Sequence, residues 1–104
     1  MSNVYYSPEQ FGLTTVGVLD YSSGSYEFDY TVVWVDDQKN LYYDDDSGCS
    51  CPSPFDGVGL NDLTKATVAQ LQGHLRARQE NAYGDYVTSS DIVDLVNAAR
   101  KAVA

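Results

Sequence analysis

The sequence predicts an α+β domain in which a three-stranded antiparallel meander is followed by two helices packed on one face of the sheet. Extended, aromatic-rich segments fill residues 13–44, whereas aliphatic side chains recur at helical spacing in residues 67–79 and 88–103. Both helical segments begin with a capping box. A length of 104 residues suits one folding unit, so we expect residues 1–104 to form a single small acidic domain.

The two longest predicted strands carry different patterns. Residues 13–20, LTTVGVLD, are rich in β-branched residues and bounded by turn formers. In residues 26–35 the period of two separates an apolar face from a face that begins polar and ends in valines, so this strand should be central and covered on both faces toward its end. The apolar face carries Tyr26, Phe28, Tyr30, Val32 and Trp34. The polar positions Glu27, Asp29 and Thr31 are expected to be exposed.

A five-residue connection of hairpin length, residues 36–40, leads to a short third strand at residues 41–44. Consecutive strands usually lie side by side, which favours the meander. Residues 45–61 are interrupted by glycines and prolines, and we expect an irregular loop there. In this loop Gly48 would permit a positive φ, and Phe55 would return the chain to the core.

The first helix is predicted to begin after Thr67, which forms a capping box with Gln70, and to run to about Gln79. Its stripe consists of Val68, Leu71 and Leu75. Gly73 within this helix costs about 1 kcal/mol relative to alanine.

The second helix follows a capping box of Thr88 and Asp91. Arg100 and Lys101 near its end suit the helix dipole. Its buried stripe is Ile92, Leu95, Val96, Ala99 and Val103.

Acidic residues are concentrated in the first two thirds of the chain. The net charge is −9, and residues 1–63 carry eleven acids against the single base Lys39, whereas residues 64–104 carry four acids and five bases. Such a negative field repels phosphate groups, so it disfavours direct binding to nucleic acids and to anionic membrane surfaces. It favours a basic partner protein, although solubility alone also accounts for a large net charge.

The stretch LYYDDDSGCSCPSPFDG, residues 41–57, contains residue types that bind metal ions. Cys49, Cys51, His74 and one of Asp44, Asp45 or Asp46 would supply four zinc ligands, but their spacing matches no standard zinc motif, and structural thiols are the plainer alternative. The EF-hand pattern fails, because position five from Asp44 is Gly48 and position twelve is Phe55. We therefore predict no cofactor.

Redox and nucleophilic chemistry are weakly supported. Cys-x-Cys followed by Pro52 has neither the spacing nor the helix of a redox pair, and no secretory signal precedes it, so thiols in a reducing cytosol are expected. His74 is the single histidine of the chain, and two interpretations of it stay open. It forms a catalytic pair with Cys49 or Cys51, or it is a histidine at the boundary between core and surface.

The stretch DSGCSCPSPF, residues 46–55, follows an aromatic-rich strand that contains Val-Val-Trp. In this arrangement the chain resembles a group of small uncharacterised actinobacteriophage proteins with a D-S-G-C-S-C-P-x-P-F motif, a resemblance that covers about residues 26–64. The resemblance implies expression in the host bacterial cytoplasm and assigns no activity.

The leading hypothesis is a non-enzymatic interaction module that binds and modulates a host protein with a basic surface. A sharper version is mimicry of nucleic-acid phosphates. Alternatives are a small zinc-binding or thiol-dependent protein centred on the Cys-x-Cys loop, and a self-associating structural or virion-accessory protein. The expected interaction surface consists of Glu27, Asp29, Tyr42, Asp44, Asp45 and Asp46.

Overall fold

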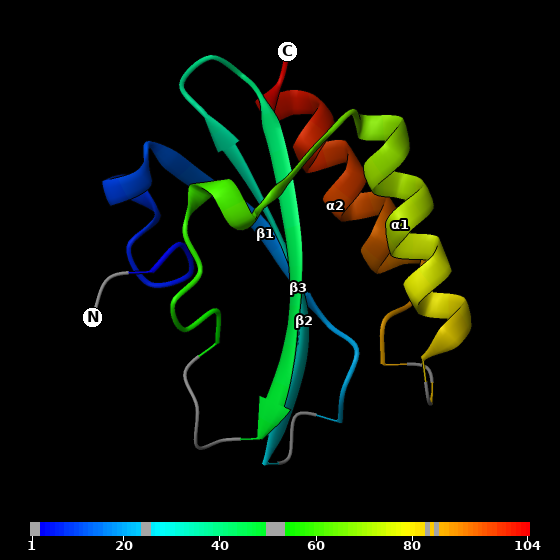
Figure 1. The fold of residues 1–104 in the computed structure, drawn as a ribbon. Coiled ribbons are helices and arrows are strands. Elements are labelled where there is room, and N and C mark those ends of the chain that lie inside the picture. The colour runs from blue at the N-terminus through cyan, green and yellow to red at the C-terminus, as the bar shows by residue number, and fades with distance from the viewer. Residues whose placement is uncertain (1–2, 24–25, 50–53, 83, 85) are drawn as a thin grey trace.

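The computed structural model describes residues 3–23, 26–49, 54–82, 84 and 86–104, without the side chain of Cys49. One antiparallel sheet has the order β1-β2-β3-β4, and two helices follow it (Figure 1). The strands are β1 (Leu13–Asp20), β2 (Glu27–Asp36), β3 (Leu41–Cys49) and β4 (Thr64–Ala66). The helices are α1 (Val68–Asn81) and α2 (Ser89–Ala102), with short 3-10 helices η1 (Pro8–Phe11) and η2 (Leu60–Asp62).

The α+β prediction with two helices is confirmed, but the expected three-stranded sheet is wrong. The fourth strand, β4, pairs with the start of β3 and is too short to show an alternating pattern. In addition, β3 continues five residues past the predicted end at residue 44, through the aspartate triplet to Cys49. Every residue of β3 has a partner on β2, so the ladder with a well-formed neighbour overrides the low strand propensity of aspartate and glycine.

Both helices cover one face of the sheet (Figure 1). Leu71 and Leu75 of α1 are fully buried, and together with the stripe of α2 they pack in one cluster with Val33 of β2. The backbone of β1 helps α2 to approach closely, because a Cβ at Gly17 would lie only 2.6 Å from Cδ1 of Leu95. None of the described helices has the length and apolarity needed to cross a bilayer.

The aromatic face of β2 packs against a second cluster, on the side of the sheet away from the helices. Trp34 is fully buried there, its Nε1 donates to the carbonyl of Val4 at 3.0 Å, and its ring meets Phe55 edge-on at 5.5 Å. The N-terminal residues and the segment before β4 thus cover this face. The prediction that Phe55 returns the chain to the core is confirmed, since Phe55 is fully buried.

Three local predictions for the strand region are wrong. The polar face of β2 lies under α1, where Thr31 is fully buried rather than exposed. Tyr26 lies outside β2 with a φ of 62° and is 87% exposed. Gly48 is an extended residue of β3 opposite Phe28, and the left-handed turn falls instead at Phe55 and Gly57.

Both capping boxes are present at the predicted positions. Thr67 Oγ1 accepts from the amide of Gln70 at 3.1 Å, and Gln70 Oε1 accepts from the amide of Thr67 at 2.9 Å. Thr88 and Asp91 repeat this exchange at the start of α2. The helix α1 passes through Gly73 without a break because this position is exposed and contacts no other segment.

The buried stripe of α1 should dominate its contribution to stability. We expect Leu75→Ala to lower the free energy of unfolding by about 2–5 kcal/mol, because it removes a fully buried side chain and leaves a cavity. The matched control Leu60→Ala, at a position 39% exposed, should cost less than about 1 kcal/mol. Urea denaturation measures both, and equal losses would contradict the assigned packing.

Candidate functional site

The pleat of β3 divides the aspartate triplet between the two faces of the sheet. Asp45 faces α1, where it contacts His74 and Arg78. Asp46 faces the other way, and its Oδ2 accepts from the amide of Phe55 at 2.7 Å. Asp44 shares the face of Asp46, since successive side chains of a strand point to opposite sides. The expected surface of adjacent carboxylates therefore does not form as one patch.

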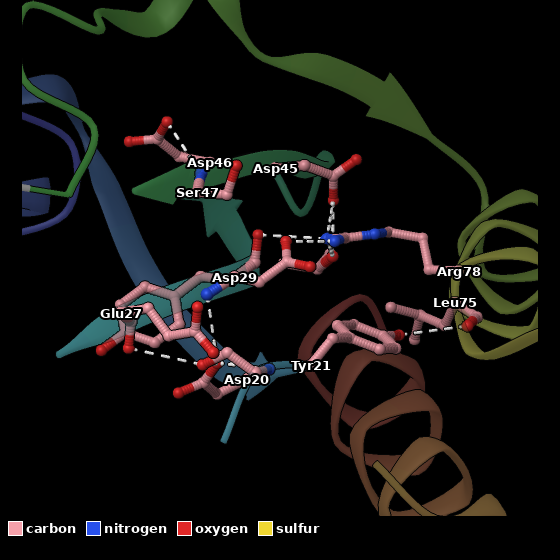
Figure 2. A network of polar contacts seen from close by, with 12 residues as sticks. Asp20, Tyr21, Glu27, Asp29, Asp45, Asp46, Ser47, Leu75 and Arg78 are labelled. Carbon is pink, nitrogen blue, oxygen red and sulfur yellow. Dashed lines mark hydrogen bonds and ion pairs between the residues drawn. The ribbon is translucent and has the colours of Figure 1, made fainter. Parts of the chain in front are cut away.

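Arg78 of α1 joins the two central strands (Figure 2). Its Nη2 donates to Asp29 of β2, and its Nη1 donates to Thr31 Oγ1 at 2.8 Å and to Asp45 Oδ1 of β3 at 3.2 Å. The guanidinium carbon lies 4.5 Å from the ring centre of Tyr21, a cation–π distance. Burial alone would lower the pKa of Arg78, but hydrogen bonds and charges of both aspartates raise it.

The groups around Arg78 are themselves hydrogen-bonded. The hydroxyl of Thr31 donates to Asp45, and the hydroxyl of Tyr21 donates to the carbonyl of Leu75 at 3.1 Å. Burial raises the pKa of Tyr21 to about 12, so the phenol stays protonated at neutral pH. No buried side-chain polar atom in the described part of the chain lacks a partner. This closed network holds α1 against β2 and β3.

His74 is bound to this network. Its Nε2 lies 2.8 Å from Asp45 Oδ2, and its ring lies 4.3 Å from that of Tyr43. Cys49 is four residues beyond Asp45 on β3, about 13 Å along an extended chain, and Cys51 lies outside the described residues. Within the described residues, no three Cys, His, Asp or Glu side chains are grouped to hold a metal. The proposed pair of Cys49 or Cys51 with His74 depends on thiols that lie outside the described part of the structure.

Asp36 and Asp44 have opposite environments. Asp36 accepts hydrogen bonds from the side chain and amide of Asn40, from the amide of Gln38 and from the hydroxyl of Tyr42, and these bonds lower its pKa. Asp44 is half-buried, and burial is the main cause that raises its pKa, with the neighbouring carboxylates adding to it. Tyr42, expected on the interaction surface, is instead a residue of β3 that is partly buried against the cluster of Trp34 and Phe55.

A cleft of about 720 Å³ opens at one end of the sheet. Its described walls come from the loop after β1, the start of β2, the end of β3 and the connection from α1 to α2. The lining includes two carboxylates and three aromatic rings: Glu27, Asp29, Tyr21, Phe28 and Tyr86. A smaller hollow of about 250 Å³, lined in part by His74 and Arg78, shares Asp29 with it.

Sequence reasoning identified Glu27 and Asp29 but missed Tyr21, Arg78 and Tyr86. One signal was available for Arg78, because it follows Leu71 and Leu75 at the spacing of the buried stripe of α1. A positively charged side chain on a buried stripe needs a negatively charged partner, and Asp29 on the polar face of β2 is such a partner. Nothing in the sequence indicated that Tyr86 would reach the same cleft, since this depends on how the two helices are connected.

Comparison with known protein families identifies one family that matches the chain. The profile of the family described as a domain of unknown function, DUF7574, matches residues 2–104. The chain belongs to this family. This match confirms the expectation that the chain belongs to an uncharacterised family. It spans the sheet, both helices and the cleft. No curated protein and no solved structure matches the chain.

Replacing Arg78 should destabilise the fold. We expect Arg78→Met to lower the free energy of unfolding by about 1–3 kcal/mol, because Asp29, Asp45 and Thr31 lose their shared donor. This range is modest because both carboxylates are 36% exposed and stay hydrated in part. Arg76→Met, at an exposed position of the same helix, should change stability by less than about 0.5 kcal/mol. Thermal and urea unfolding give the comparison, and similar losses for both variants would refute the assigned role.

Asp36 and Asp44 should contribute to stability with opposite signs. The pKa of folded Asp36 lies below its ordinary value of 3.8, so its stabilisation is present above that value and is lost as pH falls through the lowered pKa. The pKa of folded Asp44 lies above 3.8, so a penalty develops as pH rises from that value through the raised pKa. At pH 7, Asp36→Asn should therefore lower stability and Asp44→Asn should raise it.

Urea unfolding at several pH values tests this pair of substitutions. The gain from Asp44→Asn should disappear below the ordinary aspartate pKa, where both states are protonated. Asp37→Asn, at an exposed neighbouring position, serves as the control for loss of one negative charge. A loss of stability in Asp44→Asn at pH 7 would show that the half-buried carboxylate is favourably solvated or paired.

Proposed function

We propose that this chain is a non-enzymatic acidic interaction module, encoded by an actinobacteriophage, that binds a basic host protein in the host cytoplasm. The observation that carries this proposal is the unneutralised charge of residues 1–63, called here the sheet half because they contain β1, β2 and β3. Within the described residues, ion pairs involve only Asp29 and Asp45 among the eleven acids of residues 1–63. The other nine carboxylates form no ion pair among the described residues, so the net negative charge of residues 1–63 is largely uncompensated.

The distribution of the bases supports a directional field. Arg76, Arg100 and Lys101 belong to the helices, whereas the sheet strands and their loops carry only Lys39 and Lys65. A protein with such a separation of charge orients a basic partner toward its sheet half during diffusion. Exposed tyrosines add contact area of the kind that interfaces use, and the chain offers Tyr6, Tyr26 and Tyr86.

Affinity capture across salt tests the proposal. The immobilised full chain should retain one or a few basic proteins from an actinobacterial lysate at about 50 mM salt and release them by about 500 mM, as electrostatic attraction is screened. Replacing two exposed acids of the sheet half, Asp37→Asn with Asp56→Asn, should reduce retention at least about threefold. The matched pair Glu80→Gln with Asp94→Asn on the helices should have a smaller effect.

The same experiment separates the general proposal from phosphate mimicry. If the retained protein binds DNA, duplex DNA should compete with the immobilised chain for it, because both would use one basic site. Retention that resists DNA would support a basic partner of another kind. If no basic protein is enriched over bare resin at low salt, the interaction proposal is wrong.

A further inference from the structure

The cleft at the end of the sheet combines negative charge with aromatic rings. Glu27 is exposed at its rim and Asp29 forms part of its wall. Behind them Asp20 accepts hydrogen bonds from the amides of Ser22 at 3.0 Å and Asp29 at 3.1 Å, which fixes its carboxylate near the same loop. Arg78 neutralises only one of these three acids, so the described groups around the cleft retain a negative excess.

Arg78 shows within the molecule how a guanidinium is recognised at this place. Its guanidinium carbon lies over the ring of Tyr21, 4.5 Å from the ring centre, while its Nη2 donates to Asp29. Asp29 and Tyr21 both line the cleft, so they are shared between the internal arginine and the open space. Tyr86, which is 55% exposed, also lines the cleft and offers a further aromatic ring. Figure 2 shows Glu27 and Asp20 on the side of Asp29 away from Arg78.

We propose that this cleft receives the side chain of one arginine from the basic partner, an inference that rests on the proposed interaction function. A guanidinium stacks on aromatic rings and donates paired hydrogen bonds to carboxylates, which a lysine ammonium does not reproduce. Glu27 is the exposed carboxylate at the rim, where Ser23 Oγ also donates to it, and Tyr86 is the exposed aromatic ring of the lining. The volume of about 720 Å³ admits an arginine with its flanking backbone.

The test is an NMR titration of the ¹⁵N-labelled full chain with short Gly/Ser peptides that contain one central residue. An arginine peptide should shift the amide signals of Glu27, Asn81 and Tyr86. A citrulline peptide, which keeps the shape but lacks the charge, should bind at least about fivefold more weakly. A lysine peptide should bind at least about threefold more weakly. Equal shifts with arginine and citrulline, or no shifts at the cleft, would overturn the proposal.

Matched variants locate the binding. Glu27→Gln and Tyr86→Ala should each weaken the arginine peptide at least about threefold. Their controls, Glu9→Gln and Tyr6→Ala, change exposed residues of the same types at the N-terminal segment and should leave the affinity unchanged. Equal weakening by the control variants would show a general charge or surface effect and would overturn the assignment to the cleft.

The partner experiment distinguishes this inference from the function on which it rests. If salt-sensitive capture of a basic protein persists in full in Glu27→Gln and Tyr86→Ala, the interaction function stands and the cleft assignment falls. If the cleft variants lose the captured protein while the N-terminal controls keep it, the cleft is the docking point. Absence of any captured basic protein overturns the function itself, and the peptide titration still decides whether the cleft recognises arginine.

Discussion

The fold depends on one cation placed where a helix crosses the polar half of a sheet. The start of β2 presents Asp29 and Thr31 toward α1, and the middle of β3 presents Asp45 toward the same place. Thr31 is fully buried and the two carboxylates are partly covered, so covering them is unfavourable unless α1 brings a donor. Arg78 supplies that donor through both of its terminal nitrogens, and the ring of Tyr21 lies at a cation–π distance from it. The apolar stripe of α1 thus ends in an arginine rather than a leucine.

This constraint explains why the sequence predicted the elements better than their orientation. The period of two separated the faces of β2 correctly, but it could not tell which face the helices would cover, because an aromatic face is the obvious choice. Charge on α1 decides the matter, since Arg78 needs the acids of the polar face. The aromatic face then required another cover, which the N-terminal residues and the segment around Phe55 provide. Such long-range choices leave no periodic signal.

The local predictions succeeded where the chemistry is local. Capping boxes at Thr67 and Thr88 depend on residues three positions apart and were correctly placed. The end of β3 was missed because three adjacent aspartates read as a loop. In the sheet, however, they are held by β2, and one of them is compensated by Arg78. The same holds for the candidate site. Its acidic residues could be identified in the sequence, whereas the cleft could not, because it is formed by loops that meet only after folding.

The same arrangement links the stability of the domain to its surface charge. An arginine that neutralised more of the surrounding acids would stabilise the fold further but would remove the negative field on which the proposed binding of a basic partner depends. Instead, Arg78 pairs with Asp29 and Asp45, the two carboxylates next to α1. The carboxylate of Glu27 at the rim of the cleft has no ion pair among the described residues. Of the aromatic residues that line the cleft, Tyr86 is exposed to water, and an exposed ring does not serve solubility. The exposed ring of Tyr86 beside Glu27 and Asp29 at the cleft is the feature on which the proposal of recognition rests.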